Sequence, residues 1–391
     1  MPTGEINMCT TTIRGIDYRT GQPIELTTLD GLIHEIKEVE SDDKEQYIIA
    51  PGLIDIQING YKGFDFNKES LTKTEWETVC NHLLQVGVTT FFPTIITNSI
   101  DELSTILEQN MKALKQTNVN KMIGGFHLEG PYISGLKGPR GAHAKKHIKP
   151  PDWEEFCKLQ EKAKGQIKVI TLSPEWEESI EFIKKATKSG VRVGIGHTAA
   201  NTEQIKKAVQ AGANLSTHLG NGAHITLPRH PNYIWDQLAE ELLWTSVISD
   251  GHHLPKNVLK VFNKVKQKNM ILVSDSVALA GMQPGEYITP VGGKVVLTEK
   301  GRLHLKEEPN LLAGSAQNIL QGVEYLVKNK IVDLKEAINK ASIYPGNFMN
   351  LQQKEGLKIG APADIILLNQ LETNLEIVQT FKQGNYIQKN N

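Results

Sequence analysis

The chain has 391 residues, enough for two or three domains or for one large barrel with a smaller attached domain. Its 43 Lys and Arg residues nearly balance 44 Asp and Glu residues, which gives a formal net charge of −1, and the charges are scattered along the sequence. This balance argues against nucleic acid or an anionic membrane as the main partner. The hydrophobic fraction of 39% is typical of a globular protein.

Cysteine spacing and the N-terminal residues bear on the compartment. Cys9, Cys80 and Cys157 form no CxxC pair, so we expect reduced thiols rather than a disulfide framework or a thiolate zinc site. The N-terminus has no basic segment followed by an apolar core, and no stretch approaches the roughly 18 apolar residues of a membrane span. We therefore expect a cytoplasmic protein.

The first part of the chain reads as strands and the middle as strands alternating with helices. Residues 10–49 alternate apolar and polar side chains around turn residues, which predicts a small β module. Eight strand-like runs follow, and segments such as 74–84, 101–114, 178–187 and 202–210 between them have helical spacing. The runs are residues 49–59, 88–95, 121–130, 167–175, 191–198, 214–221, 245–251 and 270–277. This pattern predicts an α/β fold, a (β/α)8 TIM barrel, with an open doubly wound sheet as the alternative.

The C-terminal part returns to strand texture. We expect further helices from Asn310 to about Asn350, and strands in residues 363–369 and 375–381. The two chain ends are therefore expected to pair in one small β-sandwich domain, formed by residues 1–50 and 356–391. Residues 51–355 would form the barrel.

Polar residues that could carry chemistry follow the predicted strands, at the barrel face that holds active sites. They are Gln57, Asn59, Glu129, His197, His218, Asp250, His253 and Asp275. Two histidines and a carboxylate from separate strands can bind one divalent ion and leave a position open for water. Glu129, His197 and His218 meet that need, although each alone could be an ordinary loop or core residue. Asp275 would point into the barrel mouth and could take a proton from water, with a turn or helix cap as the alternative.

Nine short segments carry a resemblance to a known family. They read PGLIDIQING, GGFHLEGPYIS, KGPRGAH, TLSPE, GIGHTAA, STHLGNGAH, ISDGHH, LVSDS and LLAGS. In their order and approximate spacing, over nearly the whole chain, they resemble the N-acetylglucosamine-6-phosphate deacetylases of the amidohydrolase superfamily. The resemblance implies hydrolysis of N-acetylglucosamine 6-phosphate to glucosamine 6-phosphate and acetate. It assigns Glu129, His197 and His218 to the metal ion and Asp275 to proton transfer.

The same resemblance implies the residues that contact the sugar phosphate. These are Ala142, His143, Asn221, Gly222, Arg229, His253, Leu312, Ala313 and Gly314. His253 would also help to stabilise the oxyanion, and the fork of donors on Arg229 suits a phosphate. In the family, the arginine that matches Arg229 reaches the neighbouring subunit's site, so the resemblance implies a homodimer.

Two departures from family patterns affect the expected site. Many amidohydrolases carry His-x-His after the first barrel strand, whereas this chain has Gln57 and Asn59. Amides are weak zinc ligands, so we expect one divalent ion per subunit, with Zn²⁺ favoured and Fe²⁺ or another ion left open. Residues 220–224 read Gly-Asn-Gly-Ala-His where Tyr-Asn-Ala-Met is common.

Two alternatives for the function of the protein stay open: deacetylation of another N-acetylated amino sugar, and sugar-phosphate binding without catalysis.

Overall fold

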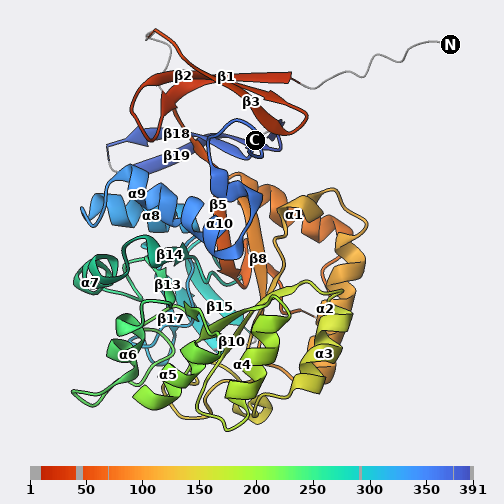
Figure 1. Cartoon of the computed structure of the whole chain (residues 1–391), viewed down its shortest axis with the longest axis vertical. Helices are drawn as coiled ribbons and strands as arrows, with labels where there is room; N and C mark the ends of the chain where they lie inside the picture. The colour runs from red at the N-terminus through yellow and green to blue at the C-terminus, as the bar shows by residue number, and fades with distance from the viewer. Residues whose placement is uncertain (1–9, 41–46, 69, 290–292, 373, 388–391) are drawn as a thin grey trace, which may run out of the picture.

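A computed structural model of the chain describes residues 10–40, 47–68, 70–289, 293–372 and 374–387. Figure 1 shows a small β module at one end of the molecule and a larger body of strands and helices beside it. Cys80 is a buried free thiol and Cys157 an exposed one, while Cys9 lies outside the described residues. In the described ranges, none of the helices has the length and apolar character needed to cross a bilayer. The cytoplasmic location stays a prediction.

Eight parallel strands form the central sheet, in the order β14-β13-β12-β11-β10-β9-β8-β5. Their bounds are β5 Leu53–Ile58, β8 Val88–Ile96, β9 Phe126–Glu129, β10 Ile167–Leu172, β11 Arg192–Ile195, β12 Leu215–Ser216, β13 Trp244–Ile248 and β14 Met270–Val273. The two edge strands meet, because the backbone N–H of Asp275 donates to the carbonyl of Gln57 at 2.9 Å. The N–H of Ser274 donates to the Asp55 carboxylate at 3.2 Å. The sheet therefore curls until its first and last strands meet, as in the predicted (β/α)8 barrel, and does not remain open.

Helices surround the barrel because each has one apolar face to bury. Their bounds are α1 Lys73–Leu84, α2 Ile100–Leu114, α3 Trp153–Lys162, α4 Ser179–Lys188, α5 Thr202–Ala211, α6 Tyr233–Ala239, α7 Lys256–Lys266, α8 Ile319–Lys328, α9 Leu334–Lys340 and α10 Ile343–Met349. In α1, the apolar side chains expected at helical spacing are all buried, and Thr72 and Glu75 form a capping box at its start. The helices predicted after Asn310 are α8 to α10, so this prediction is confirmed.

The two chain ends share one seven-stranded sheet, in the order β20-β19-β18-β4-β1-β2-β3. Its strands are β1 Thr10–Asp17, β2 Pro23–Leu29, β3 Leu32–Glu38, β4 Ile48–Pro51, β18 Ile365–Leu371, β19 Asn374–Lys382 and β20 Asn385–Ile387. Strand β4 joins the ends by pairing with both β1 and β18. Leu26, Ile33, Ile365 and Phe381 pack in one apolar cluster, so strands from the two ends face each other in two layers (Figure 1). The β module of both chain ends is confirmed, and its residue bounds stay a prediction.

Two short antiparallel pairings extend the barrel and were not expected from the sequence. One is the sheet of β15 Gly285–Thr289, β16 Gly293–Leu297 and β17 Leu303–Leu305, and the other joins β6 Gly60–Tyr61 to β7 Phe64–Asp65. Val295, Leu297 and Leu303 are buried in a separate small cluster. The strands β15 to β17 have three to five residues, and β6 and β7 have two each, too few for alternation to stand out in the sequence.

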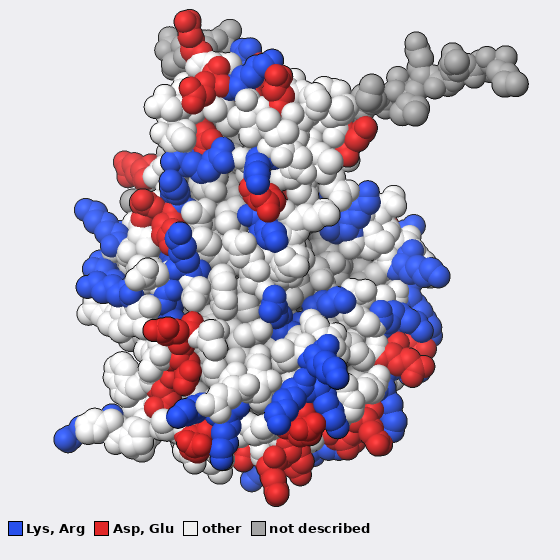
Figure 2. All heavy atoms as spheres, viewed as in Figure 1, with Lys and Arg blue, Asp and Glu red and all other residues white. Residues whose placement is uncertain are grey.

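The surface carries both signs of charge. Figure 2 shows Lys and Arg side chains interspersed with Asp and Glu on the face seen in Figure 1. This distribution agrees with the net charge of −1.

A buried ion pair in the chain-end sheet supports one stability prediction. Lys382 Nζ lies 2.7 Å from Asp364 Oδ2, with side chains 9% and 3% exposed. Lys382→Met leaves the Asp364 carboxylate buried without its cation and should cost about 3 kcal/mol of unfolding free energy. Urea unfolding followed by circular dichroism measures this. Lys37→Met, which removes an exposed pair with Glu35, is the control and should leave the midpoint unchanged. Equal midpoints for both variants would contradict the prediction.

Candidate active site

The carboxyl ends of four barrel strands bring titratable side chains together. Glu129 is the last residue of β9, whereas His197, His218 and Asp275 each stand two residues beyond the end of β11, β12 and β14. These three residues have positive φ angles of 48°, 32° and 47°. Non-glycine residues adopt this region at an energetic cost and keep it only where the surroundings fix it, often at functional sites. The same local turn thus ends three strands and presents a titratable side chain at the barrel mouth.

Glu129, His197 and His218 direct their ligand atoms to one small volume. His218 Nε2 lies 2.9 Å and His197 Nε2 3.3 Å from Glu129 Oε1, and the two nitrogens are 3.0 Å apart. Ligand atoms held tetrahedrally by zinc at about 2.0–2.1 Å would be roughly 3.3–3.4 Å from one another. The three atoms are already near that spacing. All three side chains are buried, so a divalent cation would meet little competition from bulk water.

The ring of His197 is oriented for binding a cation through Nε2. Its Nδ1 lies 2.8 Å from the carbonyl oxygen of Pro139 and must donate to it, which leaves the lone pair on Nε2. Gly222 packs against the Nδ1 edge of this ring with φ +55°, and a Cβ there would come within 2.5 Å of Nδ1. A larger residue at position 222 would therefore displace the histidine. The position of His197, a candidate metal ligand, therefore depends on glycine at position 222.

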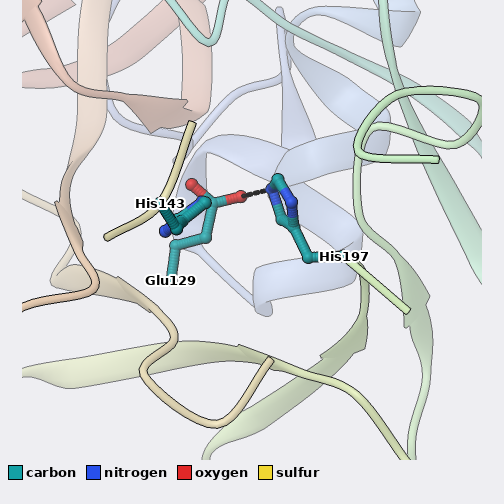
Figure 3. A group of neighbouring side chains, drawn as sticks. All are labelled: Glu129, His143 and His197. Atoms are coloured by element: carbon teal, nitrogen blue, oxygen red, sulfur yellow. Dashed lines mark ion pairs between the residues drawn. The ribbon is translucent and has the colours of Figure 1, made fainter. Parts of the chain in front are cut away.

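His143 gives a second possible ligand set. Ligand atoms of Glu129, His143 and His197 all lie within 4.8 Å of one another, and Figure 3 shows the three side chains facing the same space. His143 Nδ1 lies 2.8 Å from Thr97 Oγ1, and burial lowers the pKa of His143 to about 3. In the set with His218 the three ligand atoms lie 2.9–3.3 Å apart, which is near zinc geometry, so we favour it. His143 would then stand beside a bound ion, where a substrate contact is expected.

The charges of the cluster depend on one another. Burial raises the pKa of Glu129, but hydrogen bonds with His197 and His218 outweigh burial and hold the pKa well below its usual range. Burial lowers the pKa of His218, and the bond to Glu129 reverses this and raises it overall. The two histidines thus favour the charged form of the buried Glu129 carboxylate. A carboxylate and two imidazoles held this close together fit the divalent metal expected of the fold family.

Gln57 and Asn59 hold the two carboxylates of the site. Gln57 Nε2 donates to Glu129 Oε1 at 2.9 Å, and Asn59 Nδ2 donates to Asp275 Oδ1 at 2.8 Å. The amide nitrogens are therefore used as donors to carboxylates. The amide oxygens of both residues are buried with no hydrogen-bond partner among the residues described. They remain available to water or substrate.

Asp275 is well suited to proton transfer. Burial and the negative charge of Glu129 together raise the pKa of Asp275 to about 6, against the opposing effects of His218, His253 and Asn59. A carboxyl group with such a pKa can accept and return a proton near neutral pH. Its position two residues beyond β14 agrees with the expectation that it faces the barrel mouth.

His253 is paired with Asp250, whose role was not anticipated from the sequence. His253 Nδ1 lies 2.7 Å from Asp250 Oδ2, and its backbone N–H donates to Asp250 Oδ1 at 2.8 Å. Burial raises the pKa of Asp250, but the hydrogen bond and charge of His253 lower it overall. Asp250 therefore orients the ring of His253 and leaves Nε2 for another partner. The Asp-x-x-His spacing was the available signal.

Two predicted contact segments lie next to the cluster. Asn221 Nδ2 donates to the carbonyl of His218 at 3.2 Å. The segment Leu312–Gly314 leads into Ser315, whose carbonyl accepts from Val277 N–H at 2.9 Å just after Asp275. Gly314 has φ +111° and a Cβ there would approach Val277 within 2.7 Å, so this close approach needs glycine. Asn221 thus adjoins His218 after β12, and the segment 312–314 leads to the chain just after Asp275.

The remaining predicted contacts are more exposed. Ala142 is exposed in the loop that carries His143. Arg229 is exposed between β12 and α6, and its side chain has no hydrogen bond or ion pair with the described residues. His224, which departs from the family pattern, is held by Tyr233, whose hydroxyl oxygen lies 3.0 Å from Nδ1 and accepts from its backbone N–H at 2.8 Å. Among the described residues, no hydrogen bond or ion pair joins the Arg229 side chain to Glu129, His197 or His218.

His127 is a further residue at this site that was not predicted from the sequence. It is fully buried on β9, two residues before Glu129, and therefore on the same face of the strand. The alternation in Phe-His-Leu-Glu was a usable signal.

The larger cavity of the molecule lies away from the candidate site. It has a volume of about 700 Å³ and lies between α2 and α3, and none of the predicted site residues lines it. A small crevice instead lies beside His197, Asn221 and Gly222.

The geometry agrees with comparisons to known proteins. The model of the amidohydrolase family matches residues 48–387. The chain belongs to the amidohydrolase family. It is 30% identical over 344 residues to N-acetylglucosamine-6-phosphate deacetylase of Bacillus subtilis (strain 168), covering 86% of this chain and 84% of the relative. The resemblance inferred from the nine motifs is confirmed, and the chain is a hydrolase of amide bonds.

Two further relatives extend the comparison. N-acetylgalactosamine-6-phosphate deacetylase of Escherichia coli O157:H7 is 26% identical over 368 residues, covering 92% of this chain and 93% of the relative. The solved N-acetylglucosamine-6-phosphate deacetylase of Thermotoga maritima superposes with a TM-score of 0.84 at 26% identity, covering 97% of this chain and all of that one. Both likenesses extend over the barrel and the chain-end sheet.

The amides at positions 57 and 59 lead to a prediction of metal content. Purified protein should hold about one divalent ion per chain, because Gln57 and Asn59 are engaged as donors to carboxylates. Elemental analysis after dialysis measures this. His197→Ala and His218→Ala should lose the ion, whereas His252→Ala, which removes a half-buried ring that is hydrogen-bonded to the Lys300 carbonyl, should keep it. Two ions per chain that survive dialysis would contradict the prediction.

Proposed function

We propose that this amidohydrolase hydrolyses N-acetylglucosamine 6-phosphate to glucosamine 6-phosphate and acetate, in amino-sugar catabolism. The observation that carries the proposal is the convergence of Glu129, His197 and His218 within 3.3 Å at the barrel mouth that also holds Asp275. The 30% identity to the Bacillus subtilis deacetylase supports this substrate class.

We assign one divalent ion to Glu129, His197 and His218, and favour Zn²⁺. One buried carboxylate and two imidazole nitrogens suit zinc, and Fe²⁺ fits the same donors. When bound, the ion would polarise the amide carbonyl and lower the pKa of water toward ~7. Gln57 would keep Glu129 oriented, because it donates to the same oxygen that meets both histidines.

Asp275 would serve as general base and then as general acid. Its carboxylate accepts a proton from the attacking water as the new C–O bond forms. The same proton is then returned to the nitrogen, so that the C–N bond breaks with a neutral amine as leaving group and acetate as the other product. Asn59 holds Asp275 Oδ1, which leaves Oδ2 for this transfer.

His253 would stabilise the developing oxyanion through Nε2. Its Nδ1 is hydrogen-bonded to the Asp250 carboxylate, so Nδ1 carries a proton and Nε2 is the atom free to face substrate. With a proton on each ring nitrogen, His253 would donate from Nε2 to the oxyanion while Nδ1 donates to Asp250. We therefore propose that Asp250 orients the ring of His253 for this role.

The phosphate would be bound by Arg229 from the neighbouring subunit of a homodimer. Arg229 is exposed and unpaired in the described chain, while Asn221, Gly222 and the segment Leu312–Gly314 lie beside the ligands. Ala142 and His143 would contact the sugar from the opposite loop. The guanidinium of Arg229 from the neighbouring subunit would supply the positive charge that these contact residues lack.

The Escherichia coli relative favours one alternative substrate, N-acetylgalactosamine 6-phosphate. Acetate release from both 6-phosphates and from the two sugars without phosphate separates these possibilities. We expect the highest kcat/KM with N-acetylglucosamine 6-phosphate. A higher value with the galactosamine compound would replace the proposed substrate, and no acetate release from any of the four would favour a binding protein without catalysis.

Arg229→Ala should reduce the preference for the phosphorylated over the plain sugar by at least about tenfold, because the phosphate loses its charged partner. The ratio of kcat/KM for the two sugars measures this. Arg229→Lys keeps the charge but not the fork of donors and should give an intermediate ratio. An unchanged ratio in Arg229→Ala would place the phosphate elsewhere.

A mixing experiment tests whether Arg229 acts between subunits. Arg229→Ala and Asp275→Asn chains, refolded together, form heterodimers in which one site has both residues intact if the arginine acts in trans. Activity should then return to about a quarter of wild type, since half of the dimers have one complete site. If Arg229 acts within its own chain, mixing restores nothing.

Asp275→Asn should retain fold and metal content while kcat falls by about 10²–10⁴, because an amide cannot carry the proton. In the wild type, kcat/KM should fall as the pH drops through about 6, since protonation of Asp275 removes the base. That acidic limb should vanish or move in the variant. Loss of metal in Asp275→Asn would instead identify Asp275 as a ligand, and normal turnover would make His253 the next candidate base.

A further inference from the structure

A chain of buried hydrogen bonds crosses the barrel interior below the candidate ligands. His127, Thr171 and Thr217 are all nearly or fully inaccessible to solvent. His127 Nδ1 lies 3.1 Å from the carbonyl oxygen of Ile56, and Nε2 lies 2.7 Å from Thr171 Oγ1. Thr171 Oγ1 lies 2.8 Å from Thr217 Oγ1. We call this series of bonds the brace.

The partners fix the direction of every bond in the brace. The carbonyl of Ile56 can only accept, so Nδ1 of His127 carries the ring proton. Nε2 then has a lone pair and accepts from the Thr171 hydroxyl. Since the Thr171 proton is used there, Thr171 must accept from Thr217. The brace therefore runs Thr217 to Thr171 to His127 to Ile56, with a single tautomer of His127.

The brace connects strands that are not neighbours in the sheet. His127 on β9 reaches Ile56 on β5 across β8, and Thr171 on β10 reaches Thr217 at the end of β12 across β11. Backbone ladders join only adjacent strands, so these bonds add a separate constraint through the interior. The brace thereby sets the relative position of the strands β5, β9, β10 and β12.

Glycine in the intervening strand makes the brace possible. A Cβ on Gly194 of β11 would lie 2.4 Å from Thr217 Oγ1 and 3.1 Å from Thr171 Oγ1. Both distances are to the atoms of the bond that passes over this position. Any side chain at Gly194 would therefore displace at least one hydroxyl of the brace.

Each end of the brace adjoins a residue of the candidate site. Thr217 immediately precedes His218, Ile56 immediately precedes Gln57, and His127 is two residues from Glu129 on the same strand face. We propose that His127 is a positioning residue whose brace brings Glu129 and His218 to binding distance before a metal ion is present. This inference rests on the ligand set assigned above. His127 itself touches neither ion nor substrate in this scheme.

The test measures Zn²⁺ affinity of metal-free protein with a competing chelator dye, which does not depend on activity. Thr171→Val removes the central hydroxyl at nearly constant shape and should weaken Zn²⁺ binding by about tenfold or more, as loss of outer-shell support does. The control is Thr245→Val, because Thr245 is also fully buried in a barrel strand but its hydroxyl has no hydrogen-bond partner among the described residues. The control should bind Zn²⁺ within about twofold of wild type.

Variants of His127 and Gly194 test the brace at other points. His127→Phe should weaken Zn²⁺ binding like Thr171→Val, and the double variant should be little worse than either single one, since both break one chain. His127→Asn, which keeps a donor near the Ile56 carbonyl, should recover part of the affinity. Gly194→Ala should reduce affinity by displacing Thr171 or Thr217.

The outcomes separate the brace from the ligand assignment. Wild-type Zn²⁺ affinity in folded Thr171→Val overturns the brace, even if His127→Phe fails to fold. An equal loss of affinity in Thr245→Val also overturns it, because the effect would then be general loosening of the core. Retention of Zn²⁺ in His218→Ala would instead show that the ligand set is wrong.

Discussion

The meeting of β5 with β14 is the constraint on which the site depends. The Asp275 N–H to Gln57 carbonyl bond and the Ser274 N–H to Asp55 bond join the first and last strands of the barrel. In an open sheet these strands would be the two edges, and their residues would be far apart. Once they meet, Asn59 can hold Asp275, and the residues after eight strands share one mouth.

Charge in a buried place is the second determinant. A carboxylate such as Glu129 is costly to bury unless several donors or a cation face it. Here His197, His218 and Gln57 all approach its Oε1. The arrangement that lowers the cost of burying Glu129 also holds a carboxylate and two imidazoles close together. These are ligand types that a divalent ion binds. Folding and ion binding therefore both require these four side chains to stay close together.

Space left by glycine allows polar groups to approach closely. Gly222 lies against the His197 ring, and Gly194 leaves room for the Thr171–Thr217 bond. Left-handed turns at His197, His218 and Asp275 then aim side chains that a regular strand would direct elsewhere. Local backbone conformation and packing thus act together, since the turn points the side chain and the glycine makes room for it.

Much of this protein could be predicted from the amino-acid sequence. Alternating apolar runs and helical spacing are local patterns, so the barrel strands, the helices and the β texture of both chain ends could be recognised. Strand ends also marked Glu129, His197, His218 and Asp275 as candidates, because the active face of a barrel lies there. The short strands β15 to β17 were missed because three to five residues give too weak a period.

Only the tertiary structure decided which residues meet. Gln57 and Glu129 are 72 positions apart in sequence, His218 and Glu129 are 89 apart, and His127 and Thr171 are 44 apart. No local pattern reports such pairs, since each bond depends on the curvature of the closed sheet and on rotamers set by packing. For that reason the closeness of His143 to the cluster and the brace through His127 appeared only in three dimensions.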